Sequence, residues 1–359
     1  LVMNSYAMRE IMDDMRGMQS APISQHWFVG MPVESQSNIT LQLEKLFYKI
    51  VKSTELAYLF TSADIVFTGQ ETGIGSQLRQ CMPLIATLSP GYDYSEALAS
   101  FLSSIWISRS IYGVSWDQLA AASCISSKEA INEAVMMMRQ RYDEPNYRIL
   151  LKRRAEEIQN RAKSLASYTR SVLSERSRTL VVRVDLSYLE SAQIGLTVDQ
   201  AFAHRMTLIE TLQRSDLCEH LTGYAWAWHQ GTRKGFHLHT VFFFDGSRVC
   251  RDIDIGHAIG TLWQQITHKG GIFHNCNINK ERYERCGIGM ISRSDPEQCE
   301  NTIHAVCYLG IQEGHEAREF AQYMRIKPIG ARIFGKGGEP DGPVRMGRPP
   351  LKRLCNNGL

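Results

Sequence analysis

The sequence of 359 residues lacks the segments that mark secreted and membrane-spanning proteins. It has no recognisable signal peptide and no apolar run near the length of about 18 residues that a transmembrane helix needs. Its nine cysteines include no Cys-x-x-Cys pair. We therefore expect reduced thiols, a cytoplasmic location and no membrane partner. Because the first residue is Leu1 and not methionine, we expect either a fragment or an unusual start.

Internal repeats and chemical motifs are also missing from residues 1–147. Apolar residues in the segment LQLEKLFYKIV recur at helical spacing, as at Leu43, Leu46, Phe47 and Ile50. This spacing predicts a mainly helical N-terminal domain over residues 1–147. The sequence gives no indication of its role.

Positive charge outweighs negative charge only in the second part of the chain. Residues 1–147 have a balance of −5, whereas residues 148–359 have a balance of +8. The excess lies in two stretches, 148–183 and 325–353, which carry ten and eight basic residues. Basic blocks of this kind suit a polyanionic partner such as nucleic acid, although many basic helices are only solvated surfaces.

The periodicity changes after a long basic helix, which we expect as a linker over residues 148–178. Alternating β-branched residues then predict strands, and capped amphipathic stretches between them predict helices, such as one beginning at Pro296 behind Asp295. The resulting order indicates an α+β domain over residues 179–325, with an antiparallel sheet and its helices on one side. A basic tail rich in glycine and proline follows over residues 326–359.

Three histidines surround one hairpin in this domain. His237 and His239 are two residues apart on a strand, so their side chains share one face of the sheet. His229 precedes the turn Gly231–Lys234 and is expected to lie opposite them. We expect these three imidazoles to hold a metal ion with open positions for water or substrate, although two satisfied histidines on a buried face fit the pattern too.

A tyrosine on a later helix is a candidate nucleophile. Tyr308 lies in the segment NTIHAVCYLGIQ, with His304 four residues earlier on the same helix face. A phenol ionises only near pH 10, so a nearby cation or metal would help it to attack a phosphodiester. A structural role in the core or at the surface is the alternative for Tyr308.

Seven motifs between residues 180 and 350 resemble the HUH endonuclease superfamily. The resemblance is greatest to the replication proteins of filamentous phages and prophages, of the inovirus gene-two-protein type, which include the YagK/YfjJ C-terminal domain. The motifs stand in the expected order and are VVRVDLSY (181–188), HQGTRKGFHLH (229–239), HNCN (274–277), GIGMIS (287–292), VCYLG (306–310), RIFGKGG (332–338) and MGRPP (346–350).

This resemblance implies a rolling-circle replication initiator with an RRM-like sheet, the HUH palm. His237 and His239, with His229 as the third ligand, would bind Mg²⁺ or Mn²⁺. Tyr308 would attack a phosphodiester of single-stranded DNA, which gives a 5′-phosphotyrosine and a free 3′ hydroxyl that primes synthesis. The implied partners are single-stranded or supercoiled origin DNA and a host replication helicase or polymerase.

One position departs from the pattern of replication initiators. They often have a lysine three residues after the tyrosine, where this sequence has Ile311. The positive charge is then absent or comes from elsewhere, such as Lys327 or Lys336. For the same reason Tyr323 is a reserve nucleophile.

Basic residues of the turn and of the tail are the expected DNA contacts. The tail resembles a minor-groove hook of the Gly-Arg-Pro type, although a plain disordered tail fits its composition equally well. The candidate contacts are Arg233, Lys234, Arg332, Lys336, Arg345 and Arg348.

Two other functions are weighed against nicking. A DNA-binding replication or regulatory protein without nicking activity is favoured by Ile311, and its binding would depend on salt but not on a chelator. A cupin-type metalloenzyme would need an acid four or five residues after His239, whereas Asp245 comes after six and no second half-motif follows.

Overall fold

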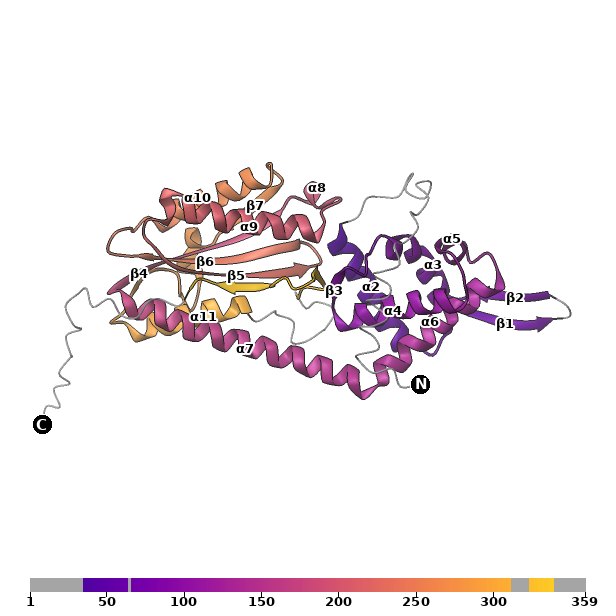
Figure 1. Ribbon diagram of the computed structural model, residues 1–359. Helices are drawn as coiled ribbons and strands as arrows, with labels where there is room; N and C mark the ends of the chain where they lie inside the picture. The colour runs from indigo at the N-terminus through magenta and orange to yellow at the C-terminus, as the bar shows by residue number, and fades with distance from the viewer. Residues whose placement is uncertain (1–34, 64–65, 311–322, 339–359) are drawn as a thin grey trace, which may run out of the picture. The chain divides into compact units, whose positions relative to one another are not determined.

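The computed structural model describes residues 35–63, 66–310 and 323–338. Contacts divide the chain into two compact units, which are described separately (Figure 1). Of the described residues, the helical unit contains 35–155, 193–199 and 324–331, and the sheet unit contains 156–192, 200–310, 323 and 332–338. Arg345, Arg348 and Ile311 lie outside the described residues.

Helices dominate the helical unit, as the apolar spacing predicts. They are α2 (Gln36–Val51), α3 (Gly73–Ala86), α4 (Glu96–Ile111), α5 (Trp116–Ala121), α6 (Ile125–Asp143) and the first part of α7 (Pro145–Glu175). One hairpin, β1 (Tyr58–Ala63) and β2 (Val66–Glu71), was not anticipated. Across the described helices of the chain, none is long and apolar enough to cross a membrane.

A segment from the far end of the chain completes the helical unit. Strand β9 (Ile326–Pro328) pairs antiparallel with β3 (Tyr92–Tyr94). Just before β9, the guanidinium of Arg325 forms an ion pair with Glu44 of α2, and both side chains are almost fully buried. The Ser95 hydroxyl donates a further hydrogen bond, 3.1 Å long, to the same carboxylate.

The sheet unit is built on an antiparallel sheet of six strands, which confirms the predicted α+β class. The path runs β10-β5-β6-β4-β7, and β8 pairs with β4 beside this path. The strands are β4 (Arg178–Tyr188), β5 (Leu221–Gly231), β6 (Gly235–Asp245), β7 (Gly271–Asn275), β8 (Gly289–Ser292) and β10 (Phe334–Lys336). The edge strand β10 lies in the stretch that we expected to have no regular structure.

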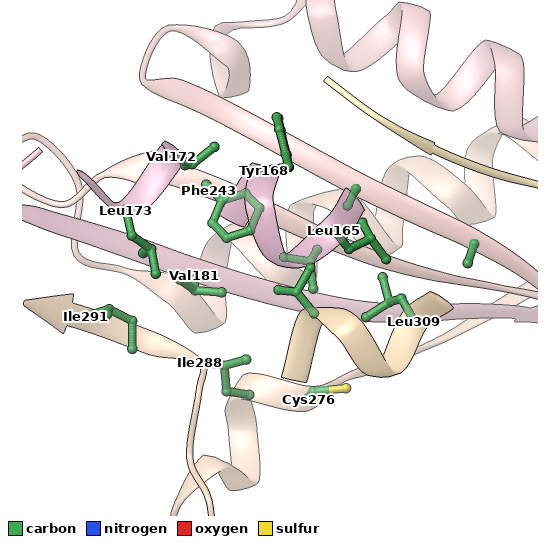
Figure 2. Packing of buried hydrophobic residues seen from close by; sticks show 14 residues of the cluster. Leu165, Tyr168, Val172, Leu173, Val181, Phe243, Cys276, Ile288, Ile291 and Leu309 are labelled. Atoms are coloured by element: carbon green, nitrogen blue, oxygen red, sulfur yellow. The ribbon is translucent and has the colours of Figure 1, made fainter. Parts of the chain in front are cut away.

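Helices cover both faces of this sheet, which corrects the expectation that they pack on one side. On one face, Phe202 of α9 (Val198–Arg214) stacks on Trp228, with ring centroids 5.5 Å apart, and α10 (Asp252–Ile266) lies over β4 and β7. On the other face, Leu165 and Tyr168 of α7 pack with Phe243 and with residues of α11 (Pro296–Gly310) (Figure 2). The central strands are apolar on both faces, so each face requires a cover.

The hairpin turn and the start of α11, both predicted from the sequence, determine where the candidate residues lie. The hairpin between β5 and β6 turns at residues 232–234, in agreement with the expected turn. Helix α11 begins at Pro296, where the Asp295 carboxylate accepts a 3.1 Å hydrogen bond from the Gln298 amide, as expected for a cap. Tyr308 therefore lies in the last turn of α11.

Candidate metal centre

The β5–β6 hairpin brings the three predicted histidines together. His229 is the direct cross-strand partner of His237, and His239 follows on the same face. The ring centroids are 4.6 to 5.7 Å apart, and one nitrogen from each ring lies within 4.8 Å of the others. The predicted convergence is confirmed as a buried cluster of three imidazoles that can serve as a metal site.

Hydrogen bonds fix the orientation of two of these rings. His237 donates from Nδ1 to the carbonyl of Gly235 over 3.0 Å, so its lone pair is on Nε2. His229 donates from Nε2 to the carbonyl of Leu309 over 3.1 Å, which leaves Nδ1 as the lone-pair nitrogen. Metal-binding histidines in proteins usually donate their other ring N–H in this way.

Asp185 holds the third ring. It lies opposite His239 on the neighbouring strand β4, and its Oδ1 is 2.7 Å from His239 Nδ1. Because Nδ1 lacks the angle of a hydrogen bond, this contact is a close electrostatic one. The carboxylate orients the ring through Nδ1, so that Nε2 is the nitrogen suited to a metal.

The donor set fits a cation. The buried Nδ1 of His229 has no hydrogen-bond partner among the described residues, which fits a nitrogen that serves as a metal ligand. With metal–nitrogen bonds of about 2.1 Å, neighbouring ligand nitrogens of a tetrahedral or octahedral ion are about 3.0–3.4 Å apart, whereas the nitrogens here are separated by up to 4.8 Å. The three rings would therefore have to move closer together to hold an ion.

Acid should destabilise the metal-free protein through His229. Burial, with His239 and His237 nearby, lowers the pKa of His229 well below its ordinary value of 6.5. Below about pH 6.5 the unfolded chain binds a proton that the folded chain does not, so stability falls by up to about 1.4 kcal/mol per pH unit. Urea unfolding in EDTA between pH 5 and 8 measures this slope.

A matched pair of variants isolates that effect. His229→Gln keeps a donor for the Leu309 carbonyl and should flatten the slope, whereas His257→Gln at an exposed site of α10 should leave it unchanged. An unchanged slope in His229→Gln would contradict the assignment. The pKa of Asp185 is depressed: burial raises it, but His239 and Arg183 outweigh burial, so Asp185 affects stability only below about pH 4.

Arg183 and Asp185 were missed as candidate residues. Both lie on β4 with their side chains on the histidine face, and Arg183 Nε is 3.3 Å from Asp185 Oδ1. The signal was present in VVRVDLSY, where two charged residues alternate with apolar ones in a strand that is otherwise buried. Charge at such positions indicates a partner or a ligand.

Tyr308 lies beside this charged pair. Its partly buried ring has the Arg183 Cζ 6.0 Å from its centroid. The next residue, Leu309, accepts the hydrogen bond from His229, so the end of α11 is tied to the cluster. His304, one turn earlier, is exposed. Tyr323, the reserve nucleophile, is 9% exposed and follows a stretch outside the described residues.

The predicted DNA contacts are found in different surroundings. Arg233 and Lys234 are exposed at the hairpin turn, next to the histidines. Arg332 is exposed ahead of β10, and the Nζ of Lys336 lies 5.0 Å from the ring centroid of Tyr168. Their role in DNA binding remains a prediction.

A pocket of about 230 Å³ opens beside His237. Its lining surface is mostly apolar with a few polar groups, and its volume is below the roughly 300–1,000 Å³ typical of sites for whole small molecules. This size suits one part of a longer ligand. The lining residues are Asp185, Leu186, Ser187, Lys234, His237, Ile272, Phe273 and His274.

Comparison with known protein families gives a match to part of the chain. Residues 143–321 match the family described as the YagK/YfjJ C-terminal domain, a stretch that holds β4 to β8 and the whole histidine cluster. No curated protein and no solved structure matches the chain.

Proposed function

We propose that the chain nicks and rejoins single-stranded DNA. Two findings support this proposal: residues 143–321 match the YagK/YfjJ C-terminal domain family, and they contain a three-histidine cluster. The proposed activity is that of a rolling-circle replication initiator of the HUH type. The histidine cluster beside a helix-borne tyrosine is the single observation that supports it most. The basic excess of residues 148–359 suits the DNA substrate.

In the proposed reaction, the Tyr308 oxygen attacks the phosphorus of a phosphodiester and its proton passes to solvent. The bond from phosphorus to the 3′ oxygen breaks, and that oxygen takes up a proton to become a 3′ hydroxyl. The 5′ phosphate stays on the tyrosine, so a later attack by a 3′ hydroxyl can rejoin the strand without ATP. A cation held by the histidines would neutralise phosphate charge and make the phosphorus more electrophilic.

The ligand set favours Mn²⁺ over Mg²⁺ within the expected pair of ions. Magnesium prefers carboxylate and water ligands and retains several waters, whereas imidazole nitrogens are better ligands for transition-metal ions, of which Mn²⁺ is one. His229, His237 and His239 offer three nitrogens, and the nearest carboxylate, Asp185, contacts a ring and not the ligand side of the cluster. We therefore expect Mn²⁺ to support a faster reaction than Mg²⁺.

The pocket beside His237 is suited to a nucleotide next to the cleaved bond. Lys234 offers a cation for a phosphate, and Ile272 and Phe273 offer an apolar surface for a base. Single-stranded DNA bound in this pocket would lie next to the histidine cluster, because His237 lines the pocket.

The proposal predicts a covalent protein–DNA adduct that Tyr308→Phe abolishes. Full-length protein with Mn²⁺ is incubated with a library of randomised single-stranded oligonucleotides and resolved in denaturing gels. A 3′ label should move with the protein, and a 5′ label should leave on a shorter strand, because the tyrosine holds the 5′ phosphate. Loss of the nucleophile should reduce adduct formation by at least about a thousandfold.

Controls separate the candidate tyrosines. Tyr224→Phe, a tyrosine on the opposite face of β5, should behave as wild type. Full adduct yield in Tyr308→Phe together with its loss in Tyr323→Phe would assign the nucleophile to Tyr323.

The second candidate is a DNA-binding protein without nicking activity, favoured by the missing lysine at Ile311. In that case no variant or wild-type sample forms an adduct, while binding weakens with salt and is indifferent to EDTA.

A further inference from the structure

A positive charge faces Tyr308 although the expected lysine is absent. The guanidinium of Arg183 lies 6.0 Å from the centroid of the Tyr308 ring, within the range of a cation–π contact. Its side chain is 16% exposed, so it is placed by the fold and is not a mobile surface group. The other cations considered for this role have different contacts: Lys327 pairs with Asp93, and Lys336 lies over Tyr168.

Arg183 is also coupled to the metal centre through one carboxylate oxygen. Oδ1 of Asp185 is 3.3 Å from Arg183 Nε and 2.7 Å from His239 Nδ1. A continuous series of contacts therefore links the Tyr308 ring through Arg183 and Asp185 to the imidazole of His239. Asp185 lies between Arg183 and the histidine cluster and contacts both.

The two terminal nitrogens of the Arg183 guanidinium can bind a ligand. Among the described residues, only Nε of the Arg183 side chain has a hydrogen bond, and its acceptor is Asp185. The two terminal nitrogens carry four N–H donors in a planar fork that matches phosphate oxygens. Burial lowers the pKa of Arg183, but Asp185, Cys276 and Tyr283 together raise it above its ordinary value, so the group keeps its charge.

We propose that Arg183 binds a non-bridging oxygen of the scissile phosphate and holds Tyr308 beside it, in place of the lysine that is missing at Ile311. The inference rests on the proposed nicking function. As the phenol oxygen bonds to phosphorus, negative charge grows on the non-bridging oxygens, and a fixed guanidinium stabilises that charge without reorganisation. Arg183 takes no proton in this step.

Adduct formation tests this role. Arg183→Gln should slow adduct formation by about 10²- to 10³-fold, as for the loss of one oxyanion donor, whereas Arg183→Lys should recover part of the rate. Millimolar guanidinium ion should accelerate Arg183→Ala and not the control Arg214→Gln on the far face. Rates within threefold of wild type in Arg183→Gln would overturn the proposal, and so would the absence of guanidinium rescue.

A binding measurement keeps the two proposals distinguishable. In a Tyr308→Phe background with Mn²⁺, fluorescence anisotropy of a labelled oligo-dT gives the slope of log affinity against log salt. Arg183→Gln should reduce this slope by about 0.7, the value for one phosphate contact to a single strand. If the wild type forms no adduct but Arg183→Gln lowers the slope, the nicking function is contradicted and the phosphate contact of Arg183 is supported. A slope that Arg183→Gln leaves unchanged would contradict the phosphate contact itself. Mn²⁺ affinity within about tenfold of wild type shows that the site is folded.

Discussion

Mn²⁺ binding is expected to disappear when His237 and His239 are both replaced by alanine. Two of the three nitrogens in the cluster are then lost, and the His229 nitrogen alone cannot hold an ion in competition with water. The dissociation constant, measured by calorimetry or by the Mn²⁺ resonance signal, should rise by well over about a hundredfold, since even supporting residues outside the ligand set contribute ten- to a hundredfold. Adduct formation should be lost with it.

Graded variants test whether the effect comes from coordination. Asp185→Asn keeps the ligands but removes the charge beside His239, and it should weaken Mn²⁺ by about ten- to a hundredfold. His257→Ala on α10 removes an exposed imidazole from outside the cluster and should change nothing. Equal Mn²⁺ affinity in the double variant and the wild type would place the metal elsewhere and remove the basis of the proposed function.

The helical unit should lose about 3–5 kcal/mol of stability when Arg325 is replaced by methionine. The substitution leaves the carboxylate of Glu44, which is 3% exposed, without its cation in the core. An unpaired buried charge keeps its full desolvation cost, and the apolar methionine cannot offset it. Hydrogen exchange of amides in α2 and α4, followed by mass spectrometry, reports the opening free energy of this unit.

Two companion variants distinguish charge pairing from simple truncation. Lys327→Met, on the adjoining strand, removes the half-exposed pair with Asp93 and should cost no more than about 1 kcal/mol. The double variant Glu44→Met with Arg325→Met should recover most of the loss, because two apolar side chains replace the pair. A double variant as unstable as the single one would show that packing of the arginine stem, and not its charge, carries the effect.

The hairpin and its histidines were predictable because their geometry is local. A strand has a side-chain period of two, and a three-residue turn between β5 and β6 leaves little freedom of register. Positions 229, 237 and 239 therefore had to share a face. The cap at Asp295 was predictable for the same reason, since it depends on residues three apart.

Asp185 and Arg183 were not predictable because they depend on which strand lies beside β6. Strand β4 precedes the hairpin by a whole helix, yet it enters the sheet between β6 and β7. No local pattern encodes that order. Helix α7 runs from one unit into the other, as expected of a linker, but its packing on the sheet through Leu165, Tyr168 and Val172 was not predictable because its many charges conceal this apolar stripe.

The pairing of Glu44 with Arg325 also has a consequence for biosynthesis. The two residues are 281 positions apart, so a ribosome that adds about 5–20 residues per second needs roughly 14–56 s to supply the second after the first. During that interval the nascent helical unit carries a carboxylate without its counter-ion and a strand without its neighbour. The helical unit can therefore mature only after residues 324–331, which follow most of the sheet unit in the sequence, have been translated.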